Sequence, residues 1–475
     1  MSDDHNSTKK MTFGLAMIPV LFLIGSLFVA LQIYGADPHI PLILSTIVAA
    51  AISIKVGYSW NEVEEGMIDS IKMSMQAILI LMIIGMLIGT WILSGVVPTM
   101  IYYGLQILSP GIFLIATTIL ATIVALATGS SWTTAGTVGI ALIGIGEGLG
   151  IPLPIVAGAI ISGAYAGDKM SPLSDTTNLA PAMAGSNLFD HIKHMVYTTG
   201  PSYVIALILY GIIGMRYSGA ESNVNTISNI LEGLSQQFTI SPILLLAPVV
   251  VIMLVIFKIP AIPGLIGGVF IGAIFAFTLQ GANLGEVIGA AHYGFESTSG
   301  IESVDELLSG GGLDGMMWTV SLILAAMSFG GVMEKTGMLF AIAEKILKVA
   351  NSTGSLVLST ILTAIGINLV AGDQYLSIVI TGRMYKDVYE ERGLHPKNLS
   401  RVLEDSGTLT SPLVPWNTCG SFMHQALGVH PFAYAPFAFV NLLNPLISIF
   451  YGYTGITMEK IDKVEIKKKE VKTIA

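Results

Sequence analysis

The amino-acid sequence predicts an all-α protein that crosses a membrane many times. Hydrophobic residues make up 53% of its 475 positions, charged residues make up 11%, and the mean hydropathy is +0.75. Apolar runs of nearly a bilayer's thickness recur along the chain, at 13–34, 73–93, 111–127, 195–215, 242–257, 317–333 and 433–453. These runs are continuous and contain Gly and Pro, as membrane helices tolerate, whereas barrel strands would alternate in polarity.

The distribution of lysine and arginine predicts the orientation. We let the chain cross the membrane at each apolar run and treat two pairs of segments as re-entrant hairpins, 111–127 with 130–146 and 355–371 with 374–388. With this topology only Arg216 of the 22 basic residues lies on the external side. That count assigns Lys169 and Arg401 to the cytoplasmic side. The positive-inside rule therefore predicts a cell-membrane protein with a cytoplasmic N-terminal tail (1–12) and a cytoplasmic Lys-rich tail (456–475). The single cysteine, Cys419, excludes an internal disulfide, and nothing in the charge pattern indicates nucleic-acid binding.

The two halves of the chain resemble each other. The tripeptide SPL occurs at 171–173 and 411–413, and Gly167 and Gly407 precede it at the same offset of 240. Further upstream, 94–95 matches 336–337, and 128–129 matches 371–372. Ordered matches of this kind indicate an internal repeat, which predicts a first repeat at 13–216, an external linker at 217–240 and a second repeat at 241–455. About seven crossings in each half, an odd number, make the repeat inverted, as in secondary transporters with interrupted helices and re-entrant hairpins.

Four polar segments interrupt the apolar pattern at corresponding places in the two halves, at 127–137, 167–181, 368–377 and 403–420. Gly and Pro free backbone carbonyls, and Ser, Thr, Asn and Asp add side-chain oxygens. Such oxygens suit Na⁺, and half-helix N-termini can face an anion. The candidate ion- and substrate-binding residues are Ser130, Ser131, Thr133, Asp168, Ser171, Ser174, Asp175, Thr176, Thr177, Asn178, Asn368, Asp373, Gln374, Asp405, Thr408, Thr410, Ser411, Trp416, Asn417 and Thr418.

Carboxylates outnumber cations in these segments. An ionisable side chain at membrane depth costs about 2.5–3.5 kcal/mol or more, so it is a functional candidate by default. Asp175, among hydroxyl and amide neighbours, is the strongest candidate for binding either a proton or Na⁺, and the Na⁺ ligands expected are Asp175, Asp373 and Thr177. Two other pairs of charged residues have a purely structural alternative. Asp168 and Lys169 neutralise each other in one alternative, and Glu404 and Asp405 lie at the cytoplasmic interface in the other.

Three of the polar strings resemble the NhaC family of Na⁺/H⁺ antiporters, at 163–185, 371–385 and 403–423. The resemblance covers nearly the whole chain. It implies the ion transporter superfamily architecture: an inverted repeat, scaffold and transport domains, an elevator-type motion and often a homodimer. It also implies Na⁺ and H⁺ as transported ions, no cofactor, and a transporter in place of an enzyme.

Other functions are compatible with the same strings. Some members of the resembled family exchange malate and lactate with H⁺ and Na⁺, and only Lys169 and Arg401 are cations near the breaks, which favours a cation-only antiporter over a small carboxylate as substrate. A channel is a second alternative. A third is an intramembrane aspartyl hydrolase, since Asp168 and Asp373 both lie in AGD triplets; their separation of 205 residues does not fit the repeat offset.

Overall fold

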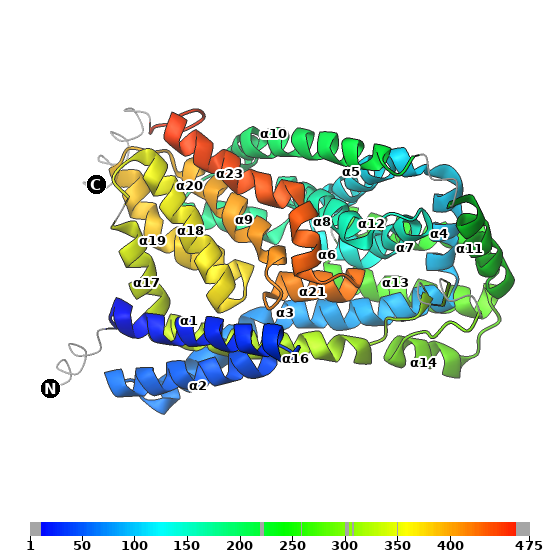
Figure 1. The fold of residues 1–475 in the computed structure, drawn as a ribbon, viewed down its shortest axis with the longest axis horizontal. Coiled ribbons are helices and arrows are strands. Elements are labelled where there is room, and N and C mark those ends of the chain that lie inside the picture. The colour runs from blue at the N-terminus through cyan, green and yellow to red at the C-terminus, as the bar shows by residue number, and fades with distance from the viewer. Residues whose placement is uncertain are drawn as a thin grey trace.

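The computed structural model describes residues 11–218, 223–257, 259–299, 304–305, 308–348 and 350–461 (Figure 1). Within these ranges the only β-type pairings are isolated bridges, so the all-α prediction is confirmed. In the described part of the chain, eight helices are long and apolar enough to cross a membrane, or up to ten if each bent pair is one span. Most of both predicted tails, at 1–10 and 462–475, lies outside the described residues.

The helices run in the following order. They are α1 (Phe13–Phe28), η1 (Val29–Ile33), α2 (His39–Val56), α3 (Trp60–Leu93), α4 (Val96–Ile107), α5 (Pro110–Thr128), α6 (Ser131–Thr134), η2 (Ala135–Gly139), α7 (Ile140–Gly148), α8 (Leu153–Met170), α9 (Asp175–Ala184), α10 (Leu188–Met215), α11 (Asn223–Gln237), η3 (Pro242–Leu245), α12 (Leu246–Ile256), α13 (Ala261–Leu279), α14 (Leu284–Tyr293), η4 (Asp314–Met316), α16 (Met317–Lys335), α17 (Met338–Leu347), α18 (Thr353–Ala371), α19 (Gln374–Glu391), α20 (Pro396–Leu403), η5 (Glu404–Thr408), η6 (Ser411–Leu413), α21 (Thr418–Leu427), α22 (Pro431–Tyr434), η7 (Ala435–Phe437) and α23 (Phe439–Thr454).

Helix starts in the second half follow those in the first at a constant spacing. The helices α18, α19, α20 and α21 begin 243 residues after α5, α6, α8 and α9 respectively. The paired glycines also match in conformation: Gly95 and Gly337 precede α4 and α17 with φ of 79° and 73°, and Gly129 and Gly372 end α5 and α18 with φ of 65° and 69°. Glycine adopts this left-handed region without the penalty that a Cβ imposes.

Two helical hairpins enter the molecule from opposite ends (Figure 1). In the first, α7 ends beside α4 and therefore near the start of α5. In the second, Arg392 Nη1, just after α19, donates to the Ser352 carbonyl just before α18 at 2.9 Å. The residues at both tips, 128–131 and 371–374, are mostly buried. The chain therefore brings two polar turns into the interior.

Two further helices are broken in the interior. The first runs from α8 through the break at 171–174 into α9, and the second runs from α20 through η5, η6 and the break at 414–417 into α21. Large apolar side chains on α1, α2, α10 and α13 are exposed. A bilayer would cover these outer faces, whereas the polar breaks lie inside.

Candidate functional site

One cavity of about 420 Å³ lies where the two hairpin tips meet the α8–α9 break. Asp168, Asp175 and Tyr375 are the ionisable residues in its wall among the described residues, and none of the described lining residues is Lys or Arg. The lining residues are Gln76, Ala77, Ile80, Thr128, Gly129, Ser130, Ser131, Trp132, Asp168, Leu173, Asp175, Ile259, Pro260, Ala261, Gln374 and Tyr375. The described part of the wall therefore presents carboxylate, hydroxyl and amide groups.

The first hairpin tip is shaped by Gly129 and Ser130. A Cβ at Gly129 would lie 2.7 Å from the Leu173 carbonyl carbon and 2.8 Å from the Ser174 nitrogen, so only glycine lets the tip pack against the α8–α9 break. Ser130 then caps α6, and its Oγ accepts from Thr133 N at 3.1 Å. The result is a helix N-terminus, the positive end of its dipole, at the cavity.

Asp168, near the end of α8, faces that helix N-terminus. Its Oδ2 accepts from Ser131 N at 3.0 Å. Its Oδ1 is buried and has no hydrogen-bond partner among the described residues. A buried carboxylate oxygen without a partner is costly. It is therefore available to a proton or a bound cation.

Hydroxyl groups stabilise the break between α8 and α9. Ser171 Oγ donates to the Leu126 carbonyl at 2.8 Å, and Thr177 Oγ1 donates to the Lys169 carbonyl at 3.0 Å. These bonds satisfy carbonyls that the interrupted helix leaves free. Thr177, predicted as a Na⁺ ligand, thus directs its proton toward the backbone of α8.

The first turn of α9 is capped in the same way. Ser174 Oγ accepts from Thr177 N at 3.4 Å and contacts Thr176 Oγ1 at 3.2 Å. Asn178 Nδ2 donates to the carbonyls of Pro172 and Ser174 at 3.0 and 2.6 Å. These predicted site residues hold the start of α9 in place, which positions Asp175.

Asp175 lines the cavity and is exposed to it. Its Oδ1 accepts from Thr176 N at 2.8 Å, and its Oδ2 accepts from the Tyr375 hydroxyl. Tyr375 is not among the residues predicted from the sequence, because a tyrosine next to a polar turn carries no distinguishing pattern. Its one signal was its position two residues after Asp373.

Asp373 caps α19 at the second tip and is 1% exposed. Its Oδ1 accepts from Tyr375 N at 2.8 Å and Leu376 N at 3.1 Å, and its Oδ2 accepts from Thr418 Oγ1 at 3.1 Å. It is not among the residues that line the cavity. Tyr375 connects the two predicted aspartates, since its backbone binds Asp373 and its hydroxyl binds Asp175.

Amide side chains join α18 to the second broken helix. Asn368 Nδ2 donates to the Gly407 carbonyl at 2.7 Å and to Thr410 Oγ1 at 3.0 Å. Asn417 Nδ2 contacts Asn368 Oδ1 at 3.3 Å, and Asn417 Oδ1 accepts from Cys419 N at 3.0 Å. These residues form a layer behind the second tip and do not line the cavity.

Other predicted residues are divided between the cavity and its surroundings. Gln374 lines the cavity and its Oε1 accepts from Ser411 Oγ at 3.4 Å. Trp416 Nε1 donates to the Leu369 carbonyl at 2.7 Å, away from the cavity. The hydroxyls of Thr133 and Thr408 are buried without a partner among the described residues.

Lys169 and Asp405 form a buried ion pair between the two halves. Lys169 Nζ lies 2.6 Å from Asp405 Oδ1, and both side chains are 0% exposed. Lys169 Nζ also donates to Asn444 Oδ1 at 3.3 Å, and Thr198 Oγ1 donates to Asp405 Oδ1 at 3.0 Å. The prediction that Lys169 faces the cytoplasm and the alternative that it neutralises Asp168 are wrong, because Lys169 is buried against a partner in the other half.

Glu404 and Asp405 also lie in the interior and not at an interface, since both are 0% exposed. Asp405 does not line the cavity. Arg401, predicted to be cytoplasmic, is likewise buried and lies 3.9 Å from Asp405 Oδ2. The second broken helix thus carries three ionisable residues that the sequence placed nearer the membrane surface.

The two AGD aspartates bind different partners. Asp168 accepts from Ser131 N, and Asp373 accepts from three donors of α19 and α21. No hydrogen bond joins the two aspartates in the part of the chain that the structure describes. They therefore do not share a proton as a catalytic aspartyl pair would.

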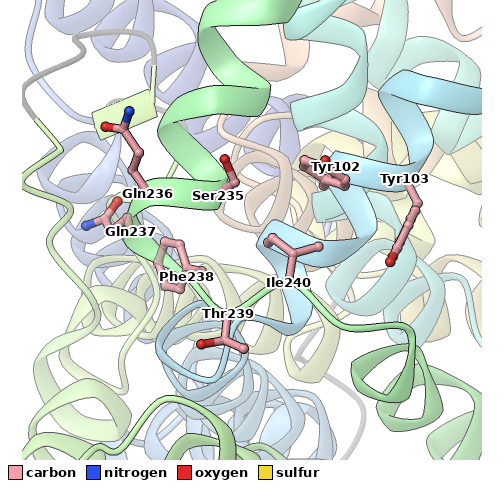
Figure 2. Close-up of a pocket in the computed structure, with 8 residues that line it drawn as sticks. All are labelled: Tyr102, Tyr103, Ser235, Gln236, Gln237, Phe238, Thr239 and Ile240. Carbon is pink, nitrogen blue, oxygen red and sulfur yellow. The ribbon is translucent and has the colours of Figure 1, made fainter.

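A second pocket of about 500 Å³ lies between α4 and the end of α11 (Figure 2). Figure 2 shows Tyr102 and Tyr103 on one side and the segment 235–240 on the other. Its lining contains tyrosine, serine, threonine and glutamine side chains and neither a carboxylate nor a cation. The carboxylate cavity is therefore the candidate functional site.

Broken helices, opposed hairpins and a buried carboxylate cavity define a membrane transporter of the secondary type. A sequence model described as the Na⁺/H⁺ antiporter family matches residues 163–456. The chain belongs to this family, as its resemblance to NhaC predicted. It is a multi-pass protein of the cell membrane and a transporter, not an enzyme.

Several relatives align over most of the chain. The Na⁺/H⁺ antiporter NhaC of Alkalihalophilus pseudofirmus is 41% identical over 95% of this chain and 98% of that protein. The arginine/ornithine antiporter ArcD of Halobacterium salinarum is 40% identical over 100% and 98%. The malate-2H⁺/Na⁺-lactate antiporter of Bacillus subtilis is 41% identical over 88% and 89%.

Among solved structures, the chain resembles MtrF of Neisseria gonorrhoeae, which is described as representing a class of antimetabolite efflux pumps. The TM-score is 0.38 and the sequence identity is 14%, over 87% of this chain and 94% of that one.

Proposed function

We propose that the protein is a secondary Na⁺/H⁺ antiporter of the cell membrane and that exchange takes place in the carboxylate cavity. The observation that supports this function is the wall of the cavity, which contains Asp168 and Asp175 and, among the lining residues that the structure describes, no Lys or Arg. Carboxylate, hydroxyl and carbonyl oxygens are the ligands that hard cations prefer. The relatives named Na⁺/H⁺ antiporter support the same ions.

In this proposal a proton and Na⁺ compete for the same carboxylates. Asp168 Oδ1 is buried without a partner, and Asp175 is exposed to the cavity, so both have room for a ligand. The three donors on Asp373 leave it little capacity for a further ligand. We infer that Asp373 acts through Tyr375, by fixing the turn from which that hydroxyl reaches Asp175.

We also infer that the halves are an inverted repeat whose transport region moves as an elevator. The constant helix spacing and the entry of the hairpins from opposite ends support the repeat (Figure 1). The basic residues Lys345, Arg392 and Lys397 lie near the end where the α18–α19 hairpin enters, which supports a cytoplasmic location for that end. Cysteine labelling from each side of sealed vesicles tests this orientation.

A homodimer is the assembly we infer from the family resemblance. Crosslinking in native membranes followed by mass measurement of the purified protein tests it. A monomer under both conditions would contradict this part of the proposal.

Flux in proteoliposomes tests the exchange itself. With a pH-sensitive dye inside the vesicles, an inward Na⁺ gradient should drive protons out of vesicles containing the wild-type protein. Asp175→Asn should abolish this movement because the amide cannot exchange a proton for Na⁺. The matched control is Asp69→Asn, which removes an exposed carboxylate and should leave flux unchanged. Near-normal flux in Asp175→Asn would remove Asp175 from the mechanism.

A second candidate is an exchanger of organic anions coupled to Na⁺ and H⁺. The specific observation in its favour is that α6 and α19 both begin at the cavity, at Ser131 and Gln374, and helix N-termini attract anions. The names of the malate/lactate and arginine/ornithine relatives point to carboxylate-bearing substrates. Counterflow with malate, lactate or arginine distinguishes the two functions, because a cation-only antiporter gives none.

A further inference from the structure

Glu404 is a buried carboxyl group that the proposed exchange does not use. It lies at the start of the π-helical segment η5, and its side chain is 0% exposed. Neither of its oxygens has a hydrogen-bond partner among the described residues. The next side chain, Asp405, is instead bonded to Lys169 and Thr198. Adjacent carboxyl groups in one segment thus have opposite environments.

The π-helical segment η5 lies in the interior and is held in place by neighbouring helices. It packs against α9, α18, α19, α20 and α23. Asn368 of α18 donates to the Gly407 carbonyl at 2.7 Å, and Asn441 of α23 donates to the Leu409 carbonyl at 2.9 Å. Side chains from two neighbouring helices therefore satisfy carbonyls in and just after this segment. Short π-helical segments occur frequently at functional sites.

The nearby cations are engaged elsewhere. Lys169 Nζ donates to Asp405 Oδ1 and Asn444 Oδ1, and Arg401 donates to Thr457 Oγ1 at 2.7 Å. An ionised carboxylate buried without any donor is too costly to persist, and such a group takes up a proton instead. Glu404 is therefore the neutral carboxyl of this cluster, while Asp405 is the ionised one.

Other polar groups connect Glu404 to the cavity. The charges that act on it are those of Lys169 and Asp168 on α8, and the nearest hydroxyls are Thr408 on its own segment and Thr176 on α9. On α10, two titratable groups bond to α20: His194 contacts Arg401 Nη1 at 3.3 Å, and His191 bonds Ser400 at 2.8 Å. Asp168 thus lines the cavity, and its negative charge also acts on Glu404.

We propose that Glu404 is an internal proton-binding site, separate from the cavity carboxylates, which releases its proton when the cavity takes up Na⁺. The positive charge of Lys169 favours the ionised form of Glu404, and the negative charge of Asp168 opposes it. A cation bound beside Asp168 cancels the opposing charge and leaves that of Lys169. The proton then leaves through the Thr176 side of the segment toward the cavity. The coupling to Na⁺ rests on the proposed function, whereas the protonation of Glu404 does not.

Infrared difference spectroscopy of purified protein tests the protonation directly. The wild type should show the carbonyl stretch of a neutral carboxylic acid at neutral pH, and Glu404→Gln should lose that band. Asp175→Asn should keep it. Identical bands in wild type and Glu404→Gln would overturn the proposal. This readout needs no transport, so it can succeed even if the proposed exchange is wrong.

Stability and proton release provide the second test. Because Gln resembles a neutral carboxylic acid, Glu404→Gln should melt at the wild-type temperature, whereas Asp405→Asn should melt lower. In weakly buffered solution, Na⁺ should release up to one proton fewer from Glu404→Gln than from wild type, with Na⁺ still bound. A drop in melting temperature equal to that of Asp405→Asn, or equal proton release, would overturn the proposal. Absence of Na⁺ binding in the wild type would instead contradict the proposed function.

Discussion

Removing one partner of the buried ion pair between Lys169 and Asp405 should strongly destabilise the fold. At the observed 2.6 Å, two unit charges attract by about 6 kcal/mol at an effective dielectric constant of about 20. The cost of removing both charges from water offsets much of this attraction. Asp405→Asn keeps the side-chain shape and the oxygen that accepts from Thr198 Oγ1, but it leaves the Lys169 charge buried without an opposite charge. We therefore expect a loss of about 3–5 kcal/mol in the free energy of unfolding.

Unfolding by SDS in mixed micelles measures this loss. The matched control is Asp69→Asn, because its pair with Lys72 has side chains 58% and 69% exposed and should contribute less than about 1 kcal/mol. The double variant Lys169→Met with Asp405→Leu should recover most of the stability, since apolar pairs often replace buried ion pairs without loss. A loss below about 1 kcal/mol in Asp405→Asn would refute the reasoning.

Three further predictions follow from single contacts. Tyr375→Phe removes the hydroxyl that binds Asp175; Na⁺ affinity measured by calorimetry should change by about tenfold or more, and an unchanged affinity would exclude a role for this hydroxyl. If H⁺ and Na⁺ compete, the apparent Na⁺ dissociation constant should rise up to tenfold for each unit of falling pH, about 1.4 kcal/mol, and a constant value would indicate separate sites. The Lys397 ammonium lowers the pKa of Glu459 outside the membrane, so their pair should hold the segment after α23 at neutral pH and weaken in acid as Glu459 protonates; the hydrogen-exchange protection factors of 455–461, relative to the intrinsic rate at each pH, should fall in acid in wild type and show less pH dependence in Glu459→Gln.

Local signals in the sequence were sufficient to find the breaks, since the four polar segments coincide with the hairpin tips and the interrupted helices. The paired glycines Gly129 and Gly372 end equivalent helices because both need a left-handed conformation, which the side chains of other residues disfavour. Ser174 and Asn417 cap the two helices that follow the breaks, with oxygens that accept from backbone N–H groups. These are interactions over three or four residues, so a pattern in the chain can predict them.

Partners that lie far apart in the chain could not be predicted in the same way. Lys169 and Asp405 are 236 residues apart, and Tyr375 is 200 residues from Asp175. Nothing near Lys169 distinguishes a lysine that pairs across the repeat from one that reaches the membrane surface. The lack of any partner for Glu404 is likewise a property of the packed interior, which only the arrangement of five surrounding helices reveals.

The two hairpin tips match in helix spacing and glycine conformation but not in charge, and this difference favours ion binding on one side of the cavity. At the first tip the cap is the neutral Ser130, and the carboxylate beside it comes from Asp168 with one oxygen unpartnered. At the second tip the equivalent cap is Asp373, whose two oxygens are already occupied by three donors. A carboxylate saturated with hydrogen bonds fixes a helix, whereas one with a free oxygen can bind a ligand. The first tip, together with Asp175, is therefore where the exchange of a proton for a cation is expected, and the second tip provides the rigid turn from which Tyr375 reaches it.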